Sequence, residues 1–291
     1  MPTNTATPIL EWLGAGDTQA RAWICDIWGV IHNGVAVYPQ AVAACRAFRA
    51  DGGRIVFVTN APRPSPGVVA QLDELGVPRD AYDAVLTSGD VTRMMLDDWA
   101  GVPTLHIGPP RDLGLFEGKG VPLIAASGAA RILCSGLYDD TTETPDTYHT
   151  MLAGLAARDC PMLCANPDIK VDRGGKIVYC GGAVAALYAA LGGDVTYAGK
   201  PHAPIYAAAC GLINAAAGTV VARSDILAIG DGVLTDIPGG IAGGFRTIYI
   251  ASAIHLDGPL TSAALCVLFP DPASRPTAGM GALAYTSGAR R

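Results

Sequence analysis

The chain has 291 residues, of which 50% are hydrophobic and 16% are charged, and its formal net charge is −6. This length predicts two domains with a substantial core, because one domain typically contains roughly 100–200 residues. Ala and Gly supply much of the apolar content, so no stretch approaches the roughly 20 large apolar residues of a membrane-spanning helix. The acidic charge and the absence of a Lys/Arg cluster argue against a nucleic-acid partner, because binding to a phosphate backbone needs a basic stripe.

The N-terminus and the cysteines indicate a cellular compartment. Residues 1–17 contain no basic start followed by an apolar run, which argues against a signal peptide. The eight cysteines form no C-x-x-C pair and mostly lie in apolar runs, where Cys behaves as a small hydrophobe. We therefore expect a cytoplasmic protein with reduced thiols, no membrane partner, and a small molecule as its ligand.

Short apolar strands alternate with helices along the chain, which is typical of a parallel sheet covered on both faces. The first pattern predicts strands at 22–25, 55–58 and 84–86 and helices at 41–49, 66–75 and 91–99. A second pattern predicts strands at 104–107, 132–134 and 162–164 and helices at 145–158 and 182–191. The first pattern then resumes with strands at 195–197, 226–229 and 247–250, a helix at 203–217, and a short helix after residue 235.

These patterns predict an α/β protein in which a smaller domain is inserted into a larger one. The larger domain comprises residues 1–88 and 195–291 and contains a parallel sheet. The inserted α/β domain comprises residues 89–194. Residues 270–291 are rich in Pro, Gly, Ser and Ala, and receive no assignment.

Four polar residues follow strands of the larger domain, and they are Asp26, Thr59, Lys200 and Asp231. The carboxyl ends of parallel strands share one sheet edge, where ligands of open α/β sheets bind. A carboxylate at this edge can attack a phosphoryl group and form an aspartyl-phosphate. Because an anion then approaches an anion, cations and hydrogen-bond donors must surround the phosphoryl oxygens. We predict Asp26 as the nucleophile, assisted by the Thr59 hydroxyl and the Lys200 ammonium.

The segment from Gly230 to Asp236 is the most specific of these features. Asp231 can join Asp26 in holding Mg²⁺, a hard ion that prefers carboxylates and water, and the flanking glycines let the backbone approach the ion. Each residue alone has an ordinary explanation, because a single Asp at a strand end usually caps a helix or forms a turn. Asp236, for example, could merely cap the following helix. Their combination at one sheet edge favours the chemical interpretation.

Four motifs resemble the haloacid dehalogenase superfamily, subclass IIA, the p-nitrophenylphosphatase-like phosphatases. The resemblance covers nearly the whole chain. Its first motif is Asp26-Ile27-Trp28-Gly29-Val30, followed by Gly34 and Pro39. The other three motifs are Val56-Phe57-Val58-Thr59-Asn60, Ala198-Gly199-Lys200-Pro201 and Ile229-Gly230-Asp231-Gly232-Val233-Leu234-Thr235-Asp236.

The resemblance implies a doubly wound, Rossmann-like core and Mg²⁺ as cofactor. The metal ligands it implies are Asp26, Asp231 and the backbone carbonyl of Trp28. Asp236 is expected next to these ligands, without binding the metal directly. It also implies a phosphate bound by Thr59, Asn60 and Lys200.

The inserted domain resembles the cap of this subclass in Asn166-Pro167-Asp168 and in the helix start Gly181-Gly182-Ala183. In the family this cap closes over the site and selects the substrate. The resemblance therefore implies that residues 89–194 select the substrate, and that Asn166 and Asp168 contact it.

One residue departs from the family pattern. The family's phosphatases carry a second Asp two residues after the nucleophile, which protonates the leaving alcohol and then activates water. Trp28 occupies this position here, and an indole N–H only donates hydrogen bonds. General acid–base help is typically worth about 10²–10⁴ in rate, so its loss weakens catalysis without abolishing it. Acyl phosphates and activated aryl phosphates have leaving groups that depart without a proton, so they need no acid. For other substrates, His32 or His202 could substitute for the missing Asp.

The sequence thus predicts a Mg²⁺-dependent phosphohydrolase that acts on a small phosphorylated metabolite through Asp26. One alternative is a catalytically silent protein that binds or senses a phosphorylated ligand, with Trp28 blocking turnover. Another is a dehalogenase, because a halide leaves without a proton, although the Asp231 motif implies a metal that dehalogenation does not need. A homo-oligomer formed through an exposed sheet edge or apolar face is left open.

Overall fold

The computed structural model describes residues 7–11, 13–14, 20–173, 176–251 and 258–287. Much of the N-terminal stretch 1–17 that argues against a signal peptide lies outside these residues. The chain divides into two compact units. The first comprises Met1–Thr59, Val69–Leu86 and Tyr206–Arg291, and the second comprises Asn60–Val68 and Thr87–Ile205.

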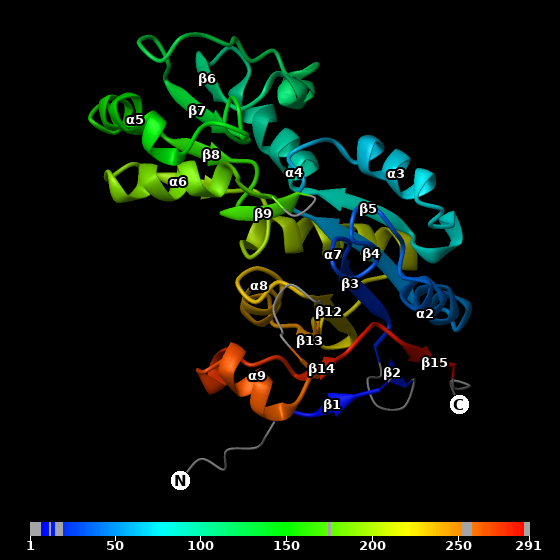
Figure 1. The fold of residues 1–291 in the computed structure, drawn as a ribbon. Coiled ribbons are helices and arrows are strands. Elements are labelled where there is room, and N and C mark those ends of the chain that lie inside the picture. Colours follow the sequence, from blue (N-terminus) through cyan, green and yellow to red (C-terminus); the bar gives the residue numbers. More distant parts are fainter. Residues whose placement is uncertain (1–6, 12, 15–19, 174–175, 252–257, 288–291) are drawn as a thin grey trace. The chain divides into compact units, whose positions relative to one another are not determined.

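The first unit is built on a seven-stranded sheet. Its strands, in spatial order, are β1 (Ile9–Leu10), β14 (Ala278–Met280), β13 (Arg246–Ile250), β12 (Ile226–Gly230), β3 (Ala22–Asp26), β4 (Arg54–Thr59) and β5 (Ala84–Thr87). β3 pairs in parallel with both β12 and β4. The chain passes from β3 to β4 and β5 on one side, and its later strands β12, β13 and β14 add on the other. The strand order therefore reverses at β3, which confirms the doubly wound core; Figure 1 draws β3 and β4 in blue beside the yellow-to-red strands β12–β14.

Helices accompany this sheet. Those within the first unit are α2 (Pro39–Ala50), α8 (Asp236–Ala242), α9 (Ser262–Leu268), and the 3₁₀ helices η1 (Arg79–Ala81), η5 (Arg223–Asp225) and η6 (Pro272–Ser274). Two more helices, α3 (Ser65–Glu74) and α7 (Ala203–Ala217), begin in the second unit and continue in the first. α2 buries Ala41, Ala44, Cys45 and Phe48, and this helical spacing gives one apolar face toward the sheet. Phe48 stacks on Trp23 of β3, with ring centroids 4.0 Å apart.

The C-terminal tail, which the sequence left unassigned, belongs to the first unit. β14 adds to the main sheet beside β13, and β15 (Tyr285–Thr286) pairs with β2 (Leu13–Gly14). Tyr285 contacts Trp23 and Phe48 edge-on, and its hydroxyl donates a 2.9 Å hydrogen bond to Asp51. The Ser287 hydroxyl also donates to Asp51 at 2.9 Å, so aromatic packing and hydrogen bonds together hold the tail.

The second unit contains a parallel sheet of four strands and an antiparallel hairpin. The sheet order is β11 (Val195–Tyr197), β8 (Met162–Cys164), β7 (Arg131–Cys134) and β6 (Thr104–Ile107), and the hairpin joins β9 (Lys170–Arg173) to β10 (Lys176–Tyr179). The helices are α4 (Ser88–Met95), α5 (His149–Ala156), α6 (Gly181–Ala190), η2 (Leu96–Trp99), η3 (Pro110–Phe116) and η4 (Pro145–Tyr148). The predicted helix at 145–158 thus divides into η4 and α5. Ile107, Ile132, Leu152 and Tyr188 belong to a core separate from that of the first unit.

The expectation that residues 195–197 return the chain to the first sheet is wrong. β11 pairs with β8 in the second unit, with Val195 opposite Met162 and Tyr197 opposite Cys164. A strand of three residues carries no local signal for its partner, because pairing is decided by long-range hydrogen bonds. The second compact unit accordingly extends to Ile205, and its bounds differ from the expected boundaries at 88/89 and 194/195.

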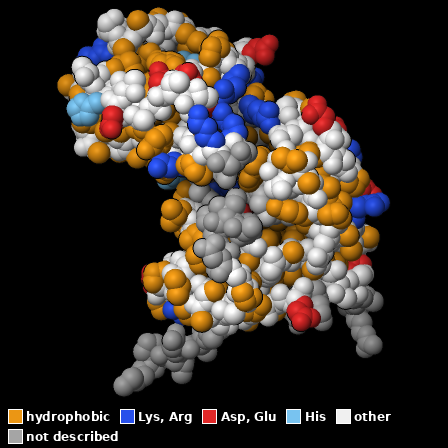
Figure 2. Space-filling view, in the orientation of Figure 1, with side chains coloured by type: hydrophobic (Ala, Val, Ile, Leu, Met, Phe, Trp, Pro, Cys, Tyr) orange, Lys and Arg blue, Asp and Glu red, His pale blue; other side chains and the backbone are white. Residues whose placement is uncertain are grey.

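Basic side chains gather in the second unit although the sequence shows no run of Lys and Arg. Arg111 and Arg173 both form ion pairs with Asp140, at 2.7 and 2.8 Å, and Lys176 donates to the carbonyl of Thr141 in the same loop. Figure 2 shows Lys and Arg side chains close together on one face of this unit. Among the described residues, no helix combines the length and the apolarity needed to cross a membrane.

Candidate active site

Three carboxylates meet at the carboxyl edge of the first sheet. Asp26 is the last residue of β3, Asp231 follows β12, and Asp236 begins α8. β3 and β12 are hydrogen-bonded neighbours on the two sides of the order reversal, so their ends must lie together. One oxygen of each carboxylate lies within 4.8 Å of the others, and all three residues are buried.

This acidic group is suited to a hard divalent cation. Three like charges so close repel one another strongly in a buried setting, and a cation would offset that repulsion. Carboxylate oxygens are the ligands that Mg²⁺ and Ca²⁺ prefer, and one or two carboxylates with water commonly hold Mg²⁺. The donor set therefore fits the predicted metal class.

Glycines create the space in which these carboxylates approach the backbone. Gly29 has φ +81°, and a Cβ on it would overlap with the Asp231 carboxylate. A Cβ on Gly230 would likewise overlap with the side chain of Asp236. Asp236 also accepts a 3.0 Å hydrogen bond from the N–H of Gly232, so it shapes the loop that carries Asp231.

We expect Gly29→Ala to destabilise the first unit more than Gly52→Ala does. Gly52 has φ +83° and a Cβ added to it would meet nothing within 4 Å, so its replacement carries only the backbone cost of about 1–2 kcal/mol. Gly29→Ala adds overlap with Asp231, typically about 1–3 kcal/mol. Thermal and urea unfolding of both variants measures the difference. Equal losses would show that the close approach of Gly29 to Asp231 does not exist in solution.

Thr59 lies beside Asp26 at the same edge. It is the last residue of β4, and Val58 is the register partner of Asp26 across the β3–β4 pair. Thr59 is therefore placed one residue beyond the position opposite Asp26 on the neighbouring strand. This is the placement that the sequence predicted for a phosphate-binding hydroxyl.

Trp28 occupies the loop that follows β3 and is 40% exposed. Its ring contacts His32 edge-on at 5.5 Å, and a Cβ on Gly34 would overlap with the indole. The loop thus holds an aromatic ring, and no carboxylate, two residues after Asp26.

The two histidines considered as replacement acids have structural contacts. His32 is 2% exposed, its Nδ1 accepts a 2.9 Å hydrogen bond from the N–H of Gly34, and burial lowers its pKa. His202 belongs to the second unit, where it stacks on Tyr197 at 4.3 Å, and burial lowers its pKa as well. Both rings are accounted for by packing, which favours the structural explanation for each.

The remaining predicted site residues form a hydrogen-bonded group in the second unit. Asn60 Nδ2 donates to Asp168 Oδ1 at 2.9 Å and to the Lys200 carbonyl at 3.0 Å, while Asn60 Oδ1 accepts from the Lys200 N–H at 2.7 Å. Asn166 Oδ1 accepts from the N–H of Asp168 at 3.1 Å. Lys200 and Asn60 are buried, with exposed fractions of 4% and 5%.

These bonds define the contacts of the Asn60 side chain. Both amide hydrogens of its side chain are already used, so the side chain has no donor left for a phosphate. The side chain holds the Lys200 backbone and the Asp168 carboxylate. A Cβ on Gly199 would overlap with Asn60 Oδ1, so the glycine before Lys200 permits this contact.

The predicted residues fall in both units. The first unit gathers Asp26, Trp28, Thr59, Asp231 and Asp236, and the second gathers Asn60, Asn166, Asp168 and Lys200. Sequence reasoning missed Tyr38, whose pKa is raised by burial and by the nearby charge of Asp231. The only sequence signal for it was an aromatic residue immediately before Pro39 at a helix start.

Comparison with known proteins agrees with this arrangement. The sequence profile of the haloacid dehalogenase-like hydrolase family matches residues 23–122, and a HAD-hydrolase-like profile matches residues 197–267. A hydrolase of the haloacid dehalogenase-like family from Brucella suis is 44% identical to this chain; its crystal structure matches with a TM-score of 0.82, covering 94% of this chain and 99% of that chain. The chain belongs to the haloacid dehalogenase-like hydrolase family. The family predicted from the motifs is thereby confirmed.

Two further solved structures share the fold. A p-nitrophenyl phosphatase from Archaeoglobus fulgidus has a TM-score of 0.72 at 20% identity, over 90% of this chain and 96% of that chain. NagD from E. coli has a TM-score of 0.68 at 22% identity, over 92% of this chain and 98% of that chain. Each match covers at least 90% of this chain and therefore includes parts of both units. The comparison with curated proteins gave no match.

Proposed function

We propose that this chain is a Mg²⁺-dependent phosphohydrolase that acts on a small phosphorylated molecule through an aspartyl-phosphate on Asp26. The observation that supports this most is the buried group of three carboxylates at the point where the strand order reverses. Family membership supports the hydrolase chemistry.

In the proposed reaction an oxygen of Asp26 attacks the phosphorus, and the bond from phosphorus to the leaving oxygen breaks. The leaving group departs with the electron pair and takes its proton from solvent. Water then attacks the phosphorus of the aspartyl-phosphate, which releases phosphate, frees Asp26 and returns a proton to solvent. The Thr59 hydroxyl and the Lys200 ammonium are the donors we assign to the phosphoryl oxygens.

We assign Asp26, Asp231 and the backbone carbonyl of Trp28 as Mg²⁺ ligands, and Asp236 as the residue that orients the Asp231 loop. Mg²⁺, when bound, supplies positive charge that offsets the charge on the phosphoryl oxygens. We further assign residues 89–194 to substrate selection, and within them Asn166 and Asp168 to contact with the substrate.

Because position 28 is Trp, no side chain there can protonate the leaving group or activate the attacking water. Both steps must proceed without this acid and base. The expected consequence is slow turnover of alkyl phosphates, and better turnover where the leaving group is stable without a proton. The same residue favours a second candidate, a protein that binds a phosphorylated ligand without turnover. Hydrolysis of p-nitrophenyl phosphate in the presence of Mg²⁺ supports the enzyme, whereas tight binding of phosphate compounds without release of phosphate supports the binding protein.

Removal of the metal is expected to abolish the activity. EDTA should eliminate phosphate release, and Asp231→Asn should weaken Mg²⁺ binding by at least about tenfold, because it removes one charged ligand. Calorimetric titration with Mg²⁺ measures the affinity. The matched control is Asp225→Asn, because Asp225 lies just before β12, at the opposite end of the same strand. Phosphate release that survives EDTA would contradict the metal assignment, and release of halide from a haloacid in the presence of EDTA would favour the dehalogenase alternative.

A further inference from the structure

Exposed apolar side chains lie on the two loops that carry the catalytic carboxylates. Trp28, Val35 and Tyr38 belong to the segment between β3 and α2, and Leu234 belongs to the loop between β12 and α8. Val35 and Leu234 are 84% and 79% exposed. Apolar residues at the ends of the central strands, beside a charged site, are suited to a ligand that is partly apolar.

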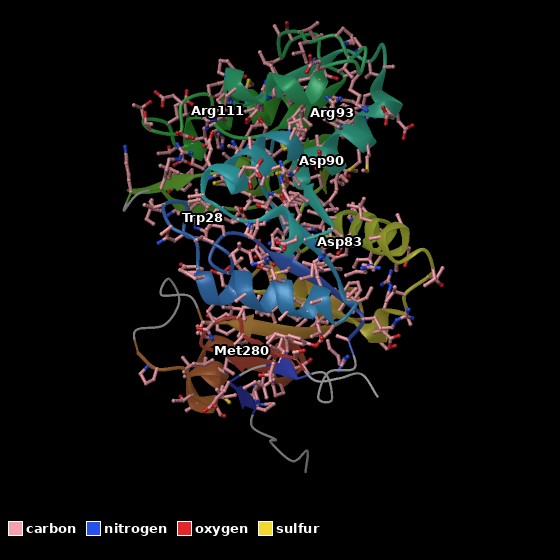
Figure 3. All side chains as sticks on the ribbon, turned by 90° about the vertical axis from the view of Figure 1, so that its right-hand side faces the viewer. Trp28, Asp83, Asp90, Arg93, Arg111 and Met280 are labelled. Carbon is pink, nitrogen blue, oxygen red and sulfur yellow. The ribbon has the colours of Figure 1, made fainter. Side chains whose placement is uncertain are left out.

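Trp28 is the aromatic side chain nearest in sequence to the nucleophile, and its ring is fixed. The N–H of Gly29 donates a 2.8 Å hydrogen bond to the carbonyl of His32, which closes the loop behind the indole. The His32 ring and the backbone of Gly34 then contact the indole, so its orientation is set by packing. Figure 3 labels Trp28 on this loop.

The same loop contacts the acidic group. Gly29, the next residue after Trp28, lies directly against the Asp231 carboxylate. Trp28 therefore stands between two residues of the site, Asp26 on its N-terminal side and Gly29 on its C-terminal side. A fixed, 40% exposed indole in this position can contact a group attached to a phosphate at Asp26.

We propose that Trp28 is a specificity-determining residue that binds the ring of an aryl phosphate monoester. This inference rests on the proposed phosphohydrolase function and names its substrate class. Two independent consequences of Trp28 lead to the same class. Without an acid at position 28 the leaving group must be stable as an anion, and a phenolate is far more stable than an alkoxide. An indole also binds an aromatic ring favourably, through stacked or edge-on contact.

The reaction balances without a further reactant. The Asp26 carboxylate forms a bond to phosphorus, the phosphorus–oxygen bond to the ring breaks, and the phenolate leaves with the electron pair. It is protonated later by solvent. Trp28 contributes contact area to this step and no proton.

The test separates ring recognition from leaving-group stability. The two substrates are phenyl phosphate and a fluorinated alkyl phosphate whose alcohol is as acidic as phenol. We expect the wild-type kcat/KM to favour phenyl phosphate. In Trp28→Leu this preference should fall about tenfold, near the upper limit for one aromatic pair, and Trp28→Phe should retain it within about threefold. The control Val220→Ala removes an exposed apolar side chain that lies before β12, at the opposite edge of the sheet.

A binding measurement gives a second readout that does not depend on turnover. We expect wild-type protein to bind phenylphosphonate about tenfold more tightly than methylphosphonate, and Trp28→Leu to lose this difference. Equal affinities for the two phosphonates in the wild-type protein, or an unchanged substrate preference in a folded Trp28→Leu, would overturn the role of Trp28 and leave the phosphohydrolase intact. Absence of phosphate release from every substrate would overturn the phosphohydrolase, while the phosphonate affinities still test the ring contact.

Discussion

Replacement of Asp26 by Asn is expected to lower phosphate release by roughly 10⁴-fold or more, because it removes the group that we propose attacks the phosphorus. The amide keeps the shape of the carboxylate but lacks its charge, so no aspartyl-phosphate can form. Asp26 is 7% exposed and lies within 4.8 Å of Asp231 and Asp236. The loss of one of three buried like charges should also leave the metal-free protein as stable as wild type, or more stable.

Three measurements test this prediction together. Phosphate release gives the rate, mass spectrometry of acid-quenched protein locates the phosphoryl group, and thermal unfolding without metal gives the stability. Asp225→Asn is the control for a general effect of removing a carboxylate from the β12 region. A phosphoryl group on another residue, or full activity in Asp26→Asn, would contradict the assignment of the nucleophile.

Replacement of Trp28 by Asp is expected to raise hydrolysis of alkyl phosphates by up to about 10²–10⁴, the typical value of one general acid–base group. A carboxyl at position 28 can protonate the alkoxide as it leaves and can then accept a proton from the attacking water. Aryl phosphates gain little, because their leaving groups need little protonation, and they also lose contact with the indole. The aspartyl-phosphate should have a shorter lifetime, which quenched-flow trapping measures.

The stability of Trp28→Asp must be known before its rates are interpreted. Truncation of a fully buried Trp typically costs about 3–5 kcal/mol, but Trp28 is 40% exposed, so we expect a smaller loss. Trp28→Leu is the matched control, because it removes the ring without adding a carboxyl. If Trp28→Asp and Trp28→Leu show the same rates on alkyl phosphates, the missing acid is not what limits turnover.

Much of the fold could be predicted because it depends on local pattern. Strands β3, β4 and β12 are short apolar runs, and helices such as α2 show apolar residues at helical spacing. Each run ends at a polar residue, and parallel strands bring such ends to one edge. Asp26, Thr59 and Asp231 could therefore be placed in one group of the first unit from the sequence alone.

Only the tertiary structure decided the features that depend on distant partners. The sheet to which β11 belongs, and the incorporation of the tail as β14 and β15, are set by pairing between segments far apart in the chain, for which a short strand carries no signal. The partners of the Asn60 side chain depend on tertiary structure for the same reason, since its amide bonds to Lys200 and Asp168, more than 100 positions away. Sequence identified Trp28 as a departure, but its exposure and fixed orientation follow from packing against His32 and Gly34. Composition and periodicity determine which helices and strands form. Hydrogen bonding and packing between remote segments determine the partners, the orientation and the exposure of each side chain.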